Sequence, residues 1–89
     1  MLHLQIKEKN KEVVVLAVDG DLTGDAVQIL AKEGRDQLKE SKCLVLDLKG
    51  VQFIDSAGIE LLQSWSGAHL QLRGGSAFIK ALLEAHKLV

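Results

Sequence analysis

Several residue types are absent or rare in this chain, and the scarcity of cysteine excludes one kind of structure. Proline and tyrosine are absent from its 89 residues, aromatic residues make up 3%, and Cys43 is the one cysteine. A single cysteine excludes an internal disulfide, and its place at the start of an apolar segment predicts a buried side chain rather than a reactive thiol. No linker, internal repeat or low-complexity tract interrupts the chain. We therefore expect a single domain over residues 1–89.

The charge balance and the length of the apolar runs exclude two kinds of partner. The formal net charge is −1, and Lys and Arg are spread among Asp and Glu, so the basic surface typical of nucleic-acid-binding proteins is missing. No apolar run approaches the roughly 20 residues that span a bilayer, and the first residues lack a signal-peptide pattern. The sequence predicts a cytoplasmic protein that neither binds nucleic acid nor inserts into a membrane.

Apolar patterns predict the elements of the first half of the chain. Leu2, Leu4 and Ile6 alternate with polar residues, as in a half-buried strand, and a polar turn separates them from the apolar run 13–18. That run suits a central strand covered on both faces. Thr23 is placed to cap the following helix. The apolar face of this helix would consist of Val27, Leu30, Ala31, Gly34 and Leu38.

The second half repeats the strand and helix alternation twice. Residues 43–48 form the next strand, and the connection 49–54 carries Phe53 and Ile54 towards the core before Asp55 or Ser56 begins a helix. The buried stripe of that helix would be Gly58, Leu61, Leu62 and Trp65. A short strand over residues 69–72 and a helix capped by Ser76 follow. The apolar side of this last helix would be Phe78, Ile79, Leu82, Leu83 and Ala85.

The order of elements, ββαβαβα, predicts the fold class. Strands that alternate with helices imply right-handed crossovers and a largely parallel sheet, to which the first hairpin adds an antiparallel edge strand. We expect an α/β protein with a single mixed, mostly parallel sheet of about four strands, covered by about three helices.

Three segments carry a family resemblance. Residues 45–48 read Val-Leu-Asp-Leu, residues 51–59 read Val-Gln-Phe-Ile-Asp-Ser-Ala-Gly-Ile, and residues 81–84 read Ala-Leu-Leu-Glu. Together with the order of elements, they resemble the STAS domain, which is found in sulfate transporters and bacterial anti-sigma-factor antagonists. The resemblance covers essentially the whole chain. It is most specific in residues 44–62, where the strand, the Phe-Ile-Asp-Ser-x-Gly pattern and the apolar helix coincide.

The resemblance implies a binding role for two loops. In the antagonist branch of the family, the Ser or Thr after the Asp is phosphorylated by a partner anti-sigma kinase, and the unmodified form captures that kinase. By this resemblance Ser56 is the phosphoacceptor, and the partner is an anti-sigma factor or serine kinase-like protein. The implied partner contacts are Asp55, Gly58, Ile59, Asp21 and Thr23. Both loops follow strand ends, which gather on one rim of a parallel sheet.

Each implied contact residue also has a purely structural explanation. Asp55 or Ser56 can be a helix cap. Gly58 can be small because its helix packs tightly on the sheet, and Ile59 can belong to the core. Residues 21–23 suit a turn followed by a cap. The sequence leaves these alternatives open.

The motifs of common enzyme classes are missing. Ser56 lacks a Gly-x-Ser-x-Gly elbow, and no histidine is spaced to serve it as a base. The Gly74-Gly75 turn is not followed by the Lys-Ser or Lys-Thr of a phosphate-binding loop. The histidines lie on different elements without metal-ligand spacing; they are His3, His69 and His86. The sequence predicts a non-catalytic protein with neither cofactor nor metal.

A constitutive subunit is the alternative function. Some small STAS proteins are similar to this chain but act as cytoplasmic accessory subunits of a phospholipid-trafficking ABC transporter, where they contact the ATPase without needing phosphorylation. The second predicted helix looks shorter than is usual in the family, and the chain stops at Val89 where many relatives continue. Either difference would leave a sheet edge or an apolar strip exposed. An ATPase, or a second copy in a homodimer, would then cover that surface.

Overall fold

The computed structural model describes residues 2–67 and 69–88. The strands are β1 (His3–Lys9), β2 (Val13–Asp19), β3 (Cys43–Gly50) and β4 (Leu70–Arg73). The helices are α1 (Asp25–Leu38), α2 (Ser56–Trp65) and α3 (Ala77–Ala85). The predicted element order is confirmed. No helix within the described part of the chain is long and apolar enough to cross a bilayer.

The sheet has the strand order β1-β2-β3-β4. β1 pairs antiparallel with β2, whereas β2 and β3, and β3 and β4, pair in parallel. The expected mixed, mostly parallel sheet is therefore confirmed. The register of the edge strand β1 shifts between Ile6 and Glu8. Such an irregularity bends an edge strand and makes it a poorer template for pairing with another chain.

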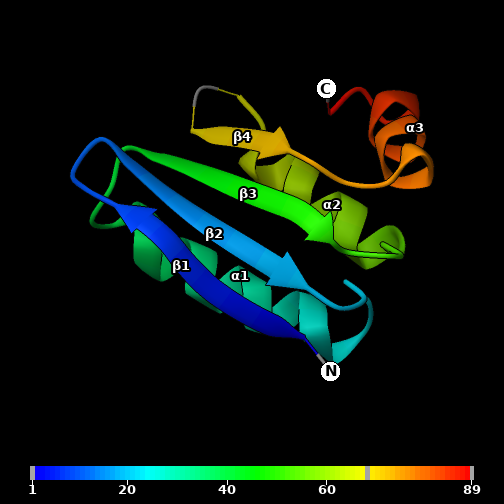
Figure 1. The fold of residues 1–89 in the computed structure, drawn as a ribbon, viewed down its shortest axis with the longest axis horizontal. Coiled ribbons are helices and arrows are strands. Elements are labelled where there is room, and N and C mark those ends of the chain that lie inside the picture. Colours follow the sequence, from blue (N-terminus) through cyan, green and yellow to red (C-terminus); the bar gives the residue numbers. More distant parts are fainter. Residues whose placement is uncertain (1, 68, 89) are drawn as a thin grey trace.

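The core lies between the sheet and the helices. Figure 1 shows α1 and α2 together behind the sheet, with α3 beside the end of the sheet near β4. Alternate residues of the two central strands face the helices, and each is at most 1% exposed; they are Val14, Leu16, Val18, Leu44, Leu46 and Leu48. This period of two is the one expected for strands with a single helix-covered face.

Residues 13–18 form a central strand that is buried on both faces, as the sequence predicts, although helices lie on only one of them (Figure 1). Val15 and Val45 point to the face without helices, yet each is only 4% exposed. The strand register places Glu8, Val15, Val45 and Gln71 in one row across the sheet. Neighbours in such a row lie close enough for long side chains to cover smaller ones. Polar residues of the two edge strands thus flank these valines in the row.

The predicted burial of four residues needs correction. Cys43 is half-buried rather than buried, because it lies on the helix-free face of β3. Phe53 is 46% exposed and Phe78 is 55% exposed. The two rings stack on each other at a centroid distance of 6.4 Å instead of entering the core. Ala85 is also exposed, so α3 buries a narrower stripe than its sequence indicates.

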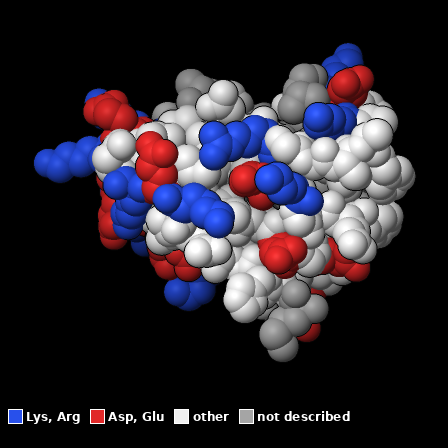
Figure 2. All heavy atoms as spheres, in the orientation of Figure 1, with Lys and Arg blue, Asp and Glu red and all other residues white. Residues whose placement is uncertain are grey.

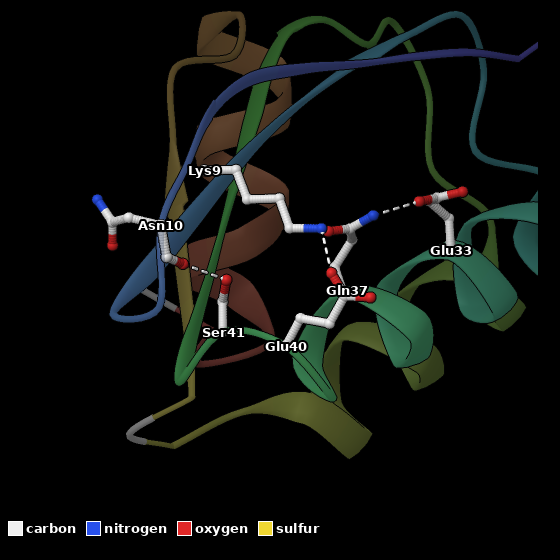
Figure 3. Close-up of polar contacts among 6 residues, drawn as sticks. All are labelled: Lys9, Asn10, Glu33, Gln37, Glu40 and Ser41. Atoms are coloured by element: carbon white, nitrogen blue, oxygen red, sulfur yellow. Dashed lines mark hydrogen bonds and ion pairs between the residues drawn. The ribbon is translucent and has the colours of Figure 1, made fainter.

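Polar contacts fix the C-terminal end of α1 to the β1–β2 hairpin (Figure 3). They are a Lys9 Nζ–Glu40 Oε1 ion pair of 2.5 Å and a 2.5 Å bond from Ser41 Oγ to the Asn10 carbonyl. Within α1 itself, Gln37 Nε2 donates to Glu33 Oε2 at 2.8 Å. The two contacts with the hairpin lie at the end of the sheet where β2 and β3 begin. The loops that follow β2 and β3 therefore occupy the opposite end.

Candidate functional site

Two loops at the C-terminal ends of β2 and β3 run side by side. The Leu22 N–H donates to the Phe53 carbonyl at 2.9 Å, and the Asp55 N–H donates to the Leu22 carbonyl at 3.2 Å. Leu22 and Ile54 form a parallel bridge, and both side chains are buried, at 0% and 3% exposure. The structure thus brings together the two loops that the resemblance singled out. We call residues 20–24 and 51–56 the rim.

Asp21 and Thr23 flank the buried Leu22 in the first rim loop. Asp21 is exposed and Thr23 is half-buried, as expected where neighbours of an inward residue point outward. The prediction that Thr23 caps α1 is wrong. The N-cap is Gly24, with φ 54° and no side-chain cap. Glycine adopts this left-handed conformation at little cost, so it takes the cap position.

Asp55 joins the N-terminal ends of two helices. It is the N-cap of α2, where its Oδ1 accepts from the Gly58 N–H at 2.8 Å, while its Oδ2 accepts from the Gly24 N–H at 3.0 Å. These bonds hold the pKa of the Asp55 carboxyl below its ordinary value of 3.8. The bond from Gly58 has the largest effect, the bond from Gly24 adds to it, and burial offsets part of the lowering. The carboxylate form is therefore the one that links the rim loops.

Replacement of Asp55 by asparagine is expected to give a pH-dependent loss of stability. Because the folded-state pKa of Asp55 is lowered, its carboxylate stabilises the fold fully above the unfolded pKa of about 4, and this contribution is lost as the pH falls through the folded pKa. Urea unfolding of wild type and Asp55→Asn from pH 7 to pH 2.5 measures it. The difference should be largest at neutral pH and shrink below about pH 4. A difference that stays constant across this range contradicts the assignment.

Ser56 is the first residue of α2 and is exposed. The sequence left open whether Asp55 or Ser56 caps this helix, and the geometry gives the cap to Asp55. The Ser56 side chain therefore lies at the surface without the capping role. The helix N-terminus beside it favours a negative group, since unpaired N–H groups and the positive end of the helix dipole lie there.

Gly58 and Ile59 lie beneath the rim. Gly58 is buried, and a Cβ atom there would lie 2.7 Å from Ile54 Cγ2 and 2.8 Å from the Leu22 carbonyl oxygen. Tight packing of α2 on the first rim loop explains this glycine. Ile59 is only 5% exposed. Of the two explanations that the sequence left open for these residues, the packing one matches their burial.

A shallow depression between α2 and α3 opens beside Ser56. Its apolar part includes Ile54, Ile59 and Leu82. The exposed Phe53–Phe78 pair lies next to it, because Phe53 precedes Ile54 and Phe78 lies one helical turn before Leu82. Sequence reasoning assigned both phenylalanines to the core and so missed this surface.

The rim end of the molecule is acidic. Figure 2 shows acidic side chains, with few basic ones among them, at the lower right, where the C-terminal ends of β2 and β3 lie. The exposed or half-buried acids on the rim and the neighbouring helix starts and strand end are Asp19, Asp21, Asp25, Asp55 and Glu60. Within residues 2–67 and 69–88, no group of three or more His, Cys, Asp or Glu residues is arranged to hold a metal ion. The three histidines are exposed.

Comparison with protein families gives one match over most of the chain. The family model described as Mlab, STAS domain, matches residues 6–88.

Solved structures share the fold. The anti-sigma factor antagonist SpoIIAA in its unphosphorylated form gives a TM-score of 0.68 at 18% identity, covering 92% of this chain and 82% of that one. The Bacillus cell fate determinant SpoIIAA in its phosphorylated form gives 0.68 at 17%, covering 97% and 85%. An anti-sigma factor antagonist from Mycobacterium paratuberculosis gives 0.66 at 20%, covering 96% and 82%. At these identities the likeness is one of fold.

A search of curated proteins gives a short local match. Over 39 residues, 44% of this chain, the sequence is 49% identical to a tRNA uridine(34) hydroxylase of Chlamydia caviae. The matched part spans 12% of the length of that curated relative. A match this short carries no argument about activity.

Proposed function

Because the chain belongs to the STAS domain family, we propose that it is a non-catalytic, protein-binding regulator that resembles the anti-sigma-factor antagonists and is switched by phosphorylation of Ser56. The observation that carries the proposal is the position of Ser56, exposed at the start of α2 while Asp55 takes the cap. The fold is shared with SpoIIAA in both its phosphorylated and unphosphorylated forms, which supports a fold that tolerates the modification.

The partner surface in this proposal is the rim. Asp21, Thr23 and Asp55 lie on the two rim loops around Ser56 and contact the partner, an anti-sigma factor or serine kinase-like protein. Gly58 and Ile59 support the rim from below, since both are buried. Gly58 holds α2 close against the first rim loop, and Ile59 lines the depression beside Ser56.

The physical basis of the switch is exclusion of the partner. A phosphate adds about −1.5 to −2 charges at neutral pH, and the α2 N-terminus favours such an anion by roughly 0.3–1 kcal/mol. The fold should therefore change little. A partner docked flush against Ser56 would have to accommodate and desolvate a bulky dianion beside the Asp55 carboxylate, and that costs several kcal/mol. Binding is lost while the domain itself stays folded.

Affinity measurements on Ser56 variants test the switch. The binding partner is isolated from the native host with the wild-type chain as bait and identified, and its affinity is then measured by calorimetry. Ser56→Ala should bind like wild type, whereas Ser56→Asp should bind at least tenfold more weakly, about 1.4 kcal/mol or more. Ser64→Asp is the matched control, because Ser64 is exposed at the other end of the same helix. Equal binding by Ser56→Asp, or widespread backbone shifts with unchanged affinity, contradicts the proposal.

A second candidate is a constitutive accessory subunit of a phospholipid-trafficking ABC transporter. The observation that favours it is the exposed Phe53–Phe78 pair, an apolar surface that needs no modification to bind. The matched family model also carries the description Mlab, not that of the antagonists. Tight co-purification with an ATPase that is insensitive to Ser56→Asp supports this candidate over the switch.

A further inference from the structure

A groove extends from the rim along the junction of α2 and α3. Its floor is the apolar depression containing Ile54, Ile59 and Leu82, and Ser56 lies on its edge. Ile54 and Ile59 are 3% and 5% exposed, so the floor is fixed by packing against the core. Leu82 is half-buried and contributes the wall from α3. We call this depression, together with the Phe53–Phe78 pair, the α2–α3 groove.

The Phe53–Phe78 pair extends the apolar surface beyond the depression. Phe78, Leu82 and His86 are spaced four residues apart along α3 and its C-cap, so they share one side of the helix over roughly 12 Å. The phenylalanine rings are nearly parallel, at 11°, and about half of each side chain is open to solvent. Two large rings left at the surface in mutual contact differ from the scattered exposed apolar residues of an ordinary surface.

The polar edge of the groove carries negative charge. Asp55 and Glu60 line it, together with His86. Asp55 has a lowered pKa, so it remains a carboxylate at neutral pH. A cation brought to this edge would find complementary charge next to an apolar floor.

We infer that the α2–α3 groove receives an apolar side chain flanked by a lysine or arginine, presented by the same partner that binds at Ser56. The inference rests on the proposed function for the identity of that partner. The apolar floor fits the hydrophobic part of this ligand, and Asp55 and Glu60 fit its cation. Aromatic residues in such pockets are typical anchors of protein interfaces.

The position of Ser56 on the groove edge connects the inference to the switch. A phosphate on Ser56 would place a hydrated dianion at the mouth of an apolar pocket. Entry of an apolar side chain would then require removal of water from that dianion, which is far more costly than burying a hydroxyl. The groove thus explains how one small modification can block a whole interface.

Small probes test the chemistry of the groove without any partner. Phenethylguanidinium carries an aromatic ring and a cation, and 3-phenylpropionate carries a similar ring and an anion. Each is titrated into the ¹⁵N-labelled full chain. The cation should give saturable amide shifts at Phe53, Phe78 and Leu82 with a roughly millimolar dissociation constant, as expected for a ligand of this size. Equal shifts from the anion, or shifts centred on other residues, overturn the inference.

Phe78→Ser and Ile29→Ser form a matched pair for the partner interface. Both replace an exposed apolar side chain, 55% and 53% exposed respectively, but Ile29 lies on α1. Phe78→Ser should lose the saturable shifts and weaken the partner at least tenfold, and Ile29→Ser should do neither. Amide shift dispersion of both variants shows that each is folded.

The variants separate failure of this inference from failure of the proposed function. If Ser56→Asp weakens the partner and Phe78→Ser does not, the groove inference is wrong and the switch stands. If Phe78→Ser weakens the partner and Ser56→Asp does not, the switch is wrong and the groove is supported. Concentration-dependent dimerisation of wild type that Phe78→Ser abolishes would overturn the inference, because a second copy would then be the occupant.

Discussion

Leu22→Ala is expected to lower the free energy of unfolding by about 2–5 kcal/mol. The Leu22 side chain is fully buried although it lies in a loop. Its backbone N–H and carbonyl bond to Phe53 and Asp55, and it bridges Ile54. Removal of three side-chain carbons leaves a cavity at the point where the two rim loops meet. Both the stability of the fold and the relative position of the loops depend on this residue.

Leu48→Ala is the matched control for Leu22→Ala. Leu48 is also 0% exposed, but it lies within β3 rather than in a rim loop. Urea unfolding should show a loss of similar size for both variants. Amide shifts across residues 20–24 and 53–56, and a weaker partner affinity, should appear with Leu22→Ala and be much smaller with Leu48→Ala. Identical effects of the two variants on the rim would contradict the assigned role of Leu22.

The fold could be predicted because each element has a clear apolar period. Leu44, Leu46 and Leu48 are spaced by two and face the helices, while Val27 and Leu30 are spaced for a helix face, and the structure buries all five. The alternation of these patterns determines the mostly parallel sheet. Adjacency of the two rim loops follows from the same reasoning, since parallel strands end on one side of a sheet.

The sequence could not show which apolar side chains of α3 stay exposed, because that depends on how much of the helix its neighbours can cover. Five of the nine residues of α3 are alanine, phenylalanine or isoleucine, and two more are leucine, yet only Ile79 and Leu83 of this helix are buried. A short helix beside the end of a small sheet cannot bury so broad an apolar stripe, so Phe78 remains at the surface. The breadth of that stripe was the sequence signal for the groove.

The cap of α1 shows a second limit of the sequence pattern. Thr23 has a better capping side chain than Gly24, but the backbone of Gly24 adopts a positive φ and its N–H bonds to Asp55, 31 residues away. Capping propensity describes a local preference, whereas the bond between Gly24 and Asp55 joins two loops and forms only in the folded chain. The same contact makes Asp55 more than the local cap of α2 that its sequence position predicts.

Gly58→Ala is expected to destabilise the protein by about 1–3 kcal/mol, although alanine is the better helix former. The added Cβ would lie 2.8 Å from the Leu22 carbonyl oxygen and 2.7 Å from Ile54 Cγ2. That carbonyl is backbone and accepts the Asp55 N–H, so it cannot move without disturbing the rim. The gain in helix propensity, up to about 1 kcal/mol, is smaller than the cost of overpacking.

Gly34→Ala provides the comparison, because its Cβ would meet the outer edge of the Trp65 ring rather than backbone. Trp65 is half-buried, so its ring has room to shift, and the loss of stability should be smaller than for Gly58→Ala. Urea unfolding of the two variants gives both values. Amide shifts at residues 21–24 should accompany Gly58→Ala alone, because its strain is transmitted to the first rim loop. A Gly58→Ala protein as stable as wild type would mean that α2 can move away from Leu22 at no cost.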